Sequence, residues 1–245
     1  MTALTLDHVT KRFGGLVAVQ DVTIEIASAH ITGLIGPNGA GKTTLFRVIS
    51  GDVRPSAGRV LCFGRETTGW SPHAVCRLGV CVTHQIVRPF GELTVLENVL
   101  VGAAFGSGGR TAGRAARADV EEVLDFTALA PRRDVLASAL TLAERKRLEI
   151  ARALATRPSI LLLDEVLAGL TPAETHQAVA LVRGIQARGV TIVMIEHVMR
   201  AVMDLSDRVL VLNYGRLIAD GSPAEVTRNP EVIEAYLGRD SAVAQ

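Results

Sequence analysis

Residues suited to phosphate chemistry are concentrated between Gly36 and Thr44, which read GPNGAGKTT. The spacing G-x-x-x-x-G-K-T, after an apolar run and before a helical pattern, predicts a phosphate-binding loop, here called the P-loop. Its glycines let consecutive backbone N–H groups point into one concavity, and the following helix adds a partial positive charge. Lys42 would bring a point charge to the β- and γ-phosphates, and the Thr43 hydroxyl would ligate Mg²⁺. We therefore predict that the chain binds a nucleoside triphosphate.

A pair of carboxylates follows the apolar run of residues 160–163. Asp164 would end a buried strand and reach Mg²⁺ through water, and Glu165 would lie at the strand edge where ligands bind in parallel sheets. There Glu165 could polarise the water that attacks the γ-phosphate. Acidic residues after an apolar run often do no more than end a strand, but the P-loop upstream favours catalysis.

His197 ends the next apolar run, residues 190–195. The carboxyl ends of parallel strands meet at one edge, so we expect His197 near the same edge as the acidic pair. A single histidine at such a position is often structural. We favour a contact with the γ-phosphate, because imidazole can donate a hydrogen bond and carry a charge near neutral pH.

The elements that would position these residues alternate in type along the chain. Residues 4–9 and 18–26 alternate apolar and polar side chains, which predicts an antiparallel pair of strands. Apolar runs then predict buried strands, and helical patterns lie between them. Residues 208–212 and 216–219 flank Asn213-Tyr214-Gly215 and predict a hairpin. Capping boxes predict helix starts at residues 94–97, 141–144 and 222–225.

This order of elements predicts an α/β fold. We expect a P-loop NTPase core with a mainly parallel sheet, an N-terminal antiparallel β subdomain and an inserted α-helical subdomain. The whole chain, residues 1–245, would be a single ATP-binding domain. Its catalytic core would comprise residues 1–85 and 157–245, and its helical subdomain residues 86–156.

Composition narrows the class of protein. Of the 245 residues 48% are apolar, which is enough for a sizeable core, and the formal net charge is +1 without a basic block, which disfavours nucleic acid as a partner. The three cysteines lack metal-ligand spacing, and their odd number disfavours a disulfide framework. The sequence has no signal-peptide core and no apolar run near the roughly 18 residues of a membrane span. We expect a cytosolic protein or one that sits on a membrane without crossing it.

Taken in order, the motifs resemble the ATPase subunits of ATP-binding cassette (ABC) transporters. The subgroup they resemble is the importer type that serves branched-chain amino acid, urea and amide transporters. The P-loop alone would indicate only the superfamily, whereas the ordered set covers essentially the whole chain. The matching stretches are residues 11–15 (KRFGG), the P-loop, Gln85 with 88–90 (RPF), 94–99 (TVLENV), 147–154 (RLEIARAL), 168–172 (AGLTP), 195–197 (IEH) and 235–238 (AYLG).

The resemblance implies a role for each matched residue. Phe13 would stack on adenine, although a phenylalanine at a strand end can also be a core residue. Gln85 would reach Mg²⁺ and the attacking water, and residues 168–171 would line a dimer interface. The implied catalytic residues are Lys42, Gln85, Glu165 and His197, and the implied metal ligands are Thr43, Gln85 and Asp164. The implied nucleotide contacts are Phe13, Gly36, Asn38, Gly39, Ala40, Gly41, Lys42, Thr43 and Thr44, with Thr141, Ala143 and Glu144 from a signature loop.

The resemblance also implies cofactors and partners. ATP and Mg²⁺ would be the cofactors, and a second ATPase subunit, the same or different, would pair head-to-tail with this one. Transmembrane permease subunits would dock at a groove near residues 87–90, and a solute-binding protein would act indirectly. The subunit would lie on the cytoplasmic face of the cell membrane. Branched-chain amino acids, urea and short amides all remain open as cargo.

Other functions stay open. The ATPase subunit of an exporter of lipid-like substrates would carry most of the same motifs. A soluble cassette ATPase that works on nucleic acid or ribosomes usually has two cassettes or coiled-coil insertions, and this chain has one P-loop and neither. A regulatory cassette with negligible hydrolysis is disfavoured by Lys42, Glu165 and His197, but an altered signature loop keeps it open.

The signature loop departs from the family pattern. The family usually has LSGGQ, and residues 140–144 read LTLAE. Ala143 would cost about 1 kcal/mol or more if its position needs a positive φ, and nothing if it needs only a helix start. It would also crowd a partner subunit if the backbone there must approach closely. Thr141 keeps the hydroxyl, but the capping box with Glu144 would commit that group to its own helix. Val166 stands where the family usually has proline, which removes no catalytic group.

Overall fold

The structure is a computed structural model that describes residues 1–83, 89–106 and 114–237. The chain divides into two compact units. The first combines Met1–Ser71 with Thr191–Gln245, and the second is Pro72–Val190. Gln85 and Arg88 lie outside the described residues. The predicted boundaries of the helical subdomain, at residues 86 and 156, stay a prediction.

The first unit contains an antiparallel sheet built on two long strands. β1 (Thr2–Phe13) pairs with β2 (Leu16–Ala27) on one side and with β4 (Ala57–Cys62) on the other, and β5 (Arg65–Glu66) follows at the edge. Val22, Ile24 and Ile26 are buried at alternate positions, so the predicted pair of strands is confirmed. Both strands are longer than predicted, because their pairing continues to the Gly14-Gly15 turn.

The first unit also contains a set of mainly parallel strands. β3 (Ile31–Ile35) is fully buried between β8 (Thr191–Ile195) and β9 (Arg208–Asn213), and both pairings are parallel. The antiparallel partner of β9 is β10 (Arg216–Gly221), so the predicted hairpin is confirmed. Tyr214 and Gly215 join these strands with φ of 45° and 79°, as a two-residue type I′ turn requires.

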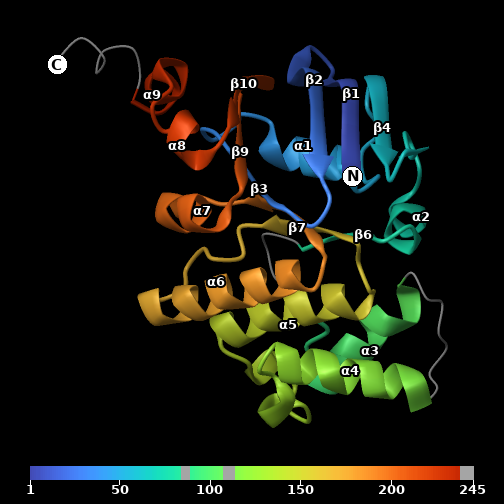
Figure 1. Ribbon diagram of the computed structural model, residues 1–245. Helices are drawn as coiled ribbons and strands as arrows, with labels where there is room; N and C mark the ends of the chain where they lie inside the picture. The colour runs from blue at the N-terminus through green and yellow to red at the C-terminus, as the bar shows by residue number, and fades with distance from the viewer. Residues whose placement is uncertain (84–88, 107–113, 238–245) are drawn as a thin grey trace. The chain divides into compact units, whose positions relative to one another are not determined.

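Helices cover these strands in the first unit (Figure 1). α1 (Lys42–Ile49) directly follows the P-loop and buries Leu45, Phe46, Val48 and Ile49, which anchors the loop to the core. The chain after β8 forms a short helix that the sequence pattern did not predict. The helices are α1 (Lys42–Ile49), α7 (Met199–Leu205), α8 (Pro223–Val226) and α9 (Pro230–Leu237).

The second unit places a buried parallel pair of strands beside helices. β6 (Val80–Val82) pairs with β7 (Ile160–Asp164), and every residue of β7 is buried, as its continuous apolar run predicts. α2 (Pro72–Arg77) precedes β6, and α6 (Pro172–Ala187) follows β7. β7 therefore delivers Asp164 from a rigid, buried element.

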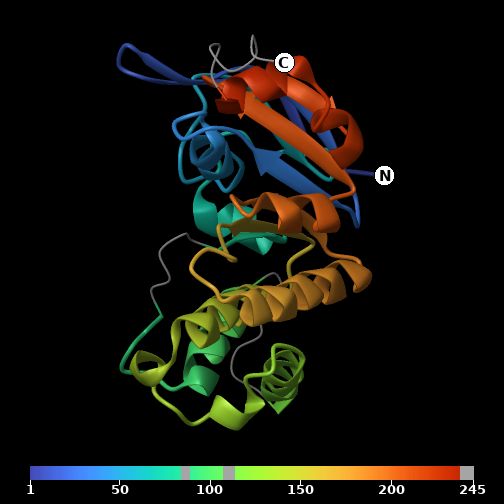
Figure 2. The same cartoon turned by 90° about the vertical axis from the view of Figure 1, so that its left-hand side faces the viewer.

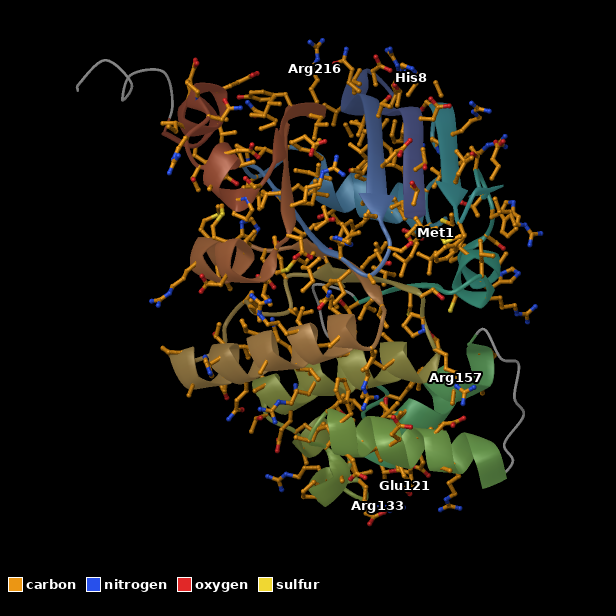
Figure 3. The ribbon with its side chains drawn as sticks, viewed as in Figure 1. Met1, His8, Glu121, Arg133, Arg157 and Arg216 are labelled. Carbon is orange, nitrogen blue, oxygen red and sulfur yellow. The ribbon has the colours of Figure 1, made fainter. Side chains whose placement is uncertain are left out.

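Three further helices of the second unit, drawn in Figures 1 and 2, pack around a core of their own. They are α3 (Val95–Phe105), α4 (Arg114–Phe126) and α5 (Leu142–Ala155), with short 3₁₀ turns at Ala130–Arg132 and Ala137–Ala139. The buried residues of this core run from Val95 to Ala151 in the sequence. Arg133 and Glu121, which lie side by side in Figure 3, add an ion pair of 2.8 Å between α4 and the chain after it.

Reciprocal capping boxes begin several of the helices. The predicted boxes at Thr94, Thr141 and Ser222 are confirmed, and another begins α6 at Thr171. In each box the hydrogen bond from the cap backbone N–H is the main cause that lowers the pKa of the glutamate three residues later. The charged carboxylate is therefore the form that caps these helices at neutral pH.

Within the described ranges, no helix is long and apolar enough to span a bilayer. The same part of the chain contains no cluster of three or more His, Cys, Asp or Glu side chains arranged to bind a metal ion. Cys62, Cys76 and Cys81 are free thiols.

Candidate nucleotide-binding site

The P-loop connects β3 to α1 in the first unit, and close backbone contacts shape both of its ends. Gly36 has φ of +148°, and a Cβ there would lie 2.0 Å from the Leu212 carbonyl oxygen of β9. Gly41 has φ of +102°, and a Cβ there would lie 2.3 Å from the Ala18 carbonyl oxygen of β2. Any side chain at these positions would clash with backbone that cannot rotate away. The loop is thus a cradle that only glycine can close at both ends.

Lys42 is held across this cradle. Its side chain is nearly buried, and its Nζ donates to the Gly36 carbonyl oxygen at 2.7 Å and to the Pro37 carbonyl oxygen at 2.9 Å. Gly41 precedes α1 and supplies no side-chain cap. The helix start therefore combines an ammonium group with backbone N–H groups that suit a phosphate cap. Thr43 is exposed and Thr44 is half-buried beside them.

Phe13 ends β1 with 44% of its surface exposed, so it is not a core residue. The Lys11 ammonium lies 4.8 Å from its ring centroid. An exposed ring next to a cation suits a planar ligand that carries phosphates, because the ring stacks while the cation attracts charge. The stacking of Phe13 on adenine stays a prediction.

His197 lies just beyond the end of β8, and its side chain is exposed. β8 pairs in parallel with β3, with Leu34 opposite Ile195, so both strands end at the same edge. The P-loop follows β3 at this edge. The first unit therefore places His197 and the P-loop after neighbouring strand ends, as expected for parallel strands.

Asp164 and Glu165 belong to the second unit. Asp164 is 6% exposed at the end of β7, and its backbone N–H donates to the Thr83 hydroxyl at 3.2 Å. Glu165 is half-buried and has φ of 52°, a left-handed conformation that is uncommon for a residue with a side chain. Residues held in such conformations cluster at functional sites.

Lys146 supports this turn from α5. It is 6% exposed, and its Nζ donates to the Glu165 carbonyl oxygen at 2.8 Å. The bond holds the backbone of the proposed base in its unusual conformation. Sequence reasoning did not find Lys146 or Thr83, because no spacing links either residue to the acidic pair.

The signature-loop residues begin α5. Thr141 is the N-cap, its hydroxyl accepts from the Glu144 N–H at 3.3 Å, and its own N–H donates to the Glu144 carboxylate at 2.9 Å. Ala143 lies in the first turn of the helix, with ordinary helical backbone and 9% of its surface exposed. The position therefore needs no positive φ in this chain. Alanine in place of the family's glycine therefore costs no backbone strain at this helix start.

In the loop after β6, the structure describes Thr83 and then the residues from Pro89 onward. Phe90 has 47% of its surface exposed, and the Arg152 guanidinium lies 4.9 Å from its ring centroid. Its backbone is fixed by Asn98, whose side-chain oxygen accepts from the Phe90 N–H at 2.9 Å and whose amide donates to the Phe90 carbonyl oxygen at 3.0 Å. Phe90 is thus an exposed apolar side chain on a rigid backbone.

Comparison with known proteins decides the family. The family model described as "ABC transporter" matches residues 19–168, and that described as "Branched-chain amino acid ATP-binding cassette transporter" matches residues 216–242. The chain belongs to the ABC transporter ATPase family. The prediction of an ABC ATPase with an α/β P-loop fold is therefore confirmed.

Similar proteins align with this ABC ATPase over nearly its full length. The high-affinity branched-chain amino acid transport ATP-binding protein BraF of Pseudomonas aeruginosa is 40% identical, with 96% of this chain and 97% of that protein covered. The corresponding protein LivG of Salmonella typhimurium is 41% identical, with the same coverage of 96% and 97%. A solved nucleotide-free cassette from an ABC transporter is 30% identical with a TM-score of 0.89, and the match covers 98% of this chain and 100% of that one.

Proposed function

We propose that this ABC ATPase hydrolyses ATP to drive import through a membrane transporter for branched-chain amino acids or related small polar solutes, such as urea or short amides. One observation carries the proposal: residues 216–242 match the branched-chain amino acid cassette model, in a chain that aligns end to end with BraF and LivG. The subunit would lie on the cytoplasmic face of the membrane, docked on permease subunits that receive cargo from a solute-binding protein.

The P-loop would hold the phosphates of ATP. Gly36 and Gly41 form a cradle that a Cβ would fill, and Lys42 already lies across it. Backbone N–H groups at the start of α1 would cap the β-phosphate, with Lys42 adding charge at the γ-phosphate. Phe13 would stack on the adenine with its exposed ring.

The residues proposed for Mg²⁺ fit the ion in chemical kind. Thr43, Gln85 and Asp164 offer hydroxyl, amide and carboxylate oxygens, which are the hard ligands that Mg²⁺ prefers. Asp164 is on a buried strand and its backbone is tied to Thr83, so its carboxylate would be held rigidly. Mg²⁺, when bound, would neutralise charge that develops on the phosphates.

Glu165 would act as the general base. It would orient and polarise the water that attacks the γ-phosphate, and the Lys146 bond to its carbonyl oxygen would hold the backbone from which the carboxylate extends. His197 would donate a hydrogen bond to the γ-phosphate. Hydrolysis would then depend on positioning and on charge stabilisation.

A complete site would require a second subunit. The start of α5, with Thr141, Ala143 and Glu144, would face the γ-phosphate of an ATP held by the P-loop of the partner in a head-to-tail dimer. The Thr141 hydroxyl accepts from its own helix, so the backbone N–H groups of the first turn would make the contact. Residues 168–171 would line the same interface.

Ala143→Gly is expected not to strengthen ATP-driven dimerisation. The alanine has ordinary helical backbone and only 9% of its surface is exposed, so little of it is available to crowd a partner. Glycine would slightly weaken the helix start instead. Sedimentation with ATP, in a Glu165→Gln background with and without Ala143→Gly, measures the effect. Tighter dimerisation of the glycine variant would mean that Ala143 does crowd the partner.

Import and its coupling can be tested in one reconstituted system. The chain is combined with its cognate permease subunits in proteoliposomes, and uptake of labelled leucine, urea and acetamide is measured with ATP. We expect uptake by the wild type and none with Glu165→Gln. ATP-dependent export, or ATPase activity without any solute uptake, would exclude the importer assignment.

Arg88→Glu combined with Phe90→Ala is expected to abolish uptake in this system while basal ATPase activity is retained. Phe90 is exposed on a rigid backbone, a setting typical of interface anchors, and Arg88 is a charged residue two positions earlier in the sequence. Phe105→Ala is the matched control, because Phe105 is 71% exposed in the same unit and lies at the far end of α3. Normal uptake by the double variant would show that the permease docks at another part of the chain.

A further inference from the structure

α7 lies against β3 (Figure 1), at a residue that has no side chain. A Cβ at Gly33 of β3 would lie 2.8 Å from the Val202 Cγ1 atom of α7 and 2.8 Å from the hydroxyl oxygen of Ser206, the C-cap of that helix. Both side chains are buried, and a β-branched valine is stiff about its first torsion. Gly33 does not have a positive φ, so the close approach of α7, and not the backbone conformation, requires glycine here.

The C-terminal end of α7 is tied to the start of β3. The Asp207 N–H donates to the Ile31 carbonyl oxygen at 2.8 Å, and the Asp207 carboxylate accepts from the Ile31 N–H at 2.8 Å. Ile31 is the first residue of β3. The helix therefore meets the strand at two points, because its end is bonded to Ile31 and its middle rests on Gly33.

The start of α7 controls where His197 lies. Residues 196–198 are all that connects the end of β8 to the start of the helix. The end of β8 is itself fixed on β3, with Ile195 opposite Leu34 in the parallel pairing. A connection of three residues between two elements that are both docked on one strand has little slack. A shift of α7 away from β3 would therefore move His197.

We propose that Gly33 is a positioning residue for His197, which admits α7 close to β3 and thereby sets where His197 lies relative to the P-loop. The P-loop follows the same strand, so β3 would fix both sides of the contact between His197 and the γ-phosphate. The inference rests on that proposed contact and is independent of the transported solute. Its benefit falls on the chemical step, which depends on the placement of groups around the γ-phosphate.

Gly33→Ala adds the methyl group that this packing excludes, and α7 must move to relieve the two contacts. We expect kcat for ATP hydrolysis to fall about 10- to 100-fold, as a misplacement of about 1 Å can cause. The KM for ATP should change less than about 3-fold, because the contacts of Gly36 with β9 and of Gly41 with β2 are left in place. Histidine-selective NMR measures the displacement directly. The imidazole signals of His197, assigned with His197→Gln, should shift in Gly33→Ala.

Gly221→Ala is the matched control in the same unit. A Cβ at Gly221 would lie 2.9 Å from a carboxylate oxygen of Glu225, so the added methyl meets the capping box of α8 and leaves α7 alone. Its kcat and its His197 signals should match the wild type.

Asp207→Ala loosens the end of α7 without adding an atom, and it decides the question if Gly33→Ala does not fold. The helix loses its side-chain bond to β3, so we expect a smaller loss of kcat, about 3- to 10-fold, together with shifted His197 signals. Thermal unfolding of each variant reports on folding.

The outcomes separate the inference from the proposed function. Unchanged His197 signals in the folded variants overturn the inference. A rise in KM at unchanged kcat also overturns it, because Gly33 would then support the P-loop and not His197. His197→Gln, measured in parallel, tests the function itself. Wild-type turnover in His197→Gln would exclude the proposed contact with the γ-phosphate, whereas the NMR signals would still show whether Gly33 positions that residue.

Discussion

Glu165→Gln is expected to lower ATP hydrolysis by about 10²–10⁴-fold while ATP binding is kept. Glutamine has nearly the same shape as glutamate but cannot accept the proton of the attacking water. Lys146 bonds to the backbone carbonyl at this position, so the turn should persist in the variant. The ATP-bound dimer should then accumulate, because the closed state is no longer consumed by hydrolysis.

Phosphate release under saturating ATP, together with sedimentation of the same samples, measures both effects. Glu92→Gln is a matched control, since Glu92 is an exposed carboxylate of the same unit and precedes α3. It should hydrolyse ATP like the wild type. Wild-type turnover in Glu165→Gln would show that Glu165 is not the general base.

Gly41→Ala is expected to weaken ATP binding by about 10²-fold or more. The added methyl would lie 2.3 Å from the Ala18 carbonyl oxygen, and the φ of +102° is unfavourable for alanine even without that clash. The loop must open to relieve the contact, and this moves the start of α1 and Lys42 away from the phosphates. Loss of the cradle should therefore abolish turnover as well.

Gly39→Ala separates clash from backbone strain. Gly39 has φ of +80° but no atom within 4 Å of the added carbon, so alanine there costs only the left-handed backbone, about 1–2 kcal/mol or some 10-fold in affinity. Titration with a fluorescent ATP analogue, with thermal unfolding as a check on folding, compares the two. Equal affinities of the two variants would show that contact with β2 does not shape the loop.

Features with a local physical cause were predictable from the sequence. The spacing of glycines around Lys42, the capping boxes at Thr94 and Thr141, and the apolar run that ends at Asp164 each act over a few residues. Local conformational preference, side-chain hydrogen bonds to the nearest N–H groups and continuous burial do not depend on distant parts of the chain. The P-loop, the helix starts and β7 could therefore be named before the structure was known.

The sequence did not predict α7, because it lacks a local start signal. It also did not predict the end of β1, because the local signal there favoured a turn. α7 is short, and Val198 at its N-cap makes no side-chain hydrogen bond, so no start signal exists in the sequence. Residues 11–13 precede two glycines and favour a turn, yet Phe13 pairs with Leu16 because the long β1–β2 ladder continues to the end. Pairing across the ladder outweighed the local turn preference.

The supports of the site arise only in the tertiary structure. Lys146 bonds to the carbonyl of Glu165 from 19 residues away, and Thr83 to the N–H of Asp164 from 81 residues away. A sequence determines which groups can bind phosphate, because that capacity lies in the side chain or the local turn. Which distant residues hold those groups in place depends on long-range packing, and packing carries no spacing that a sequence pattern can reveal.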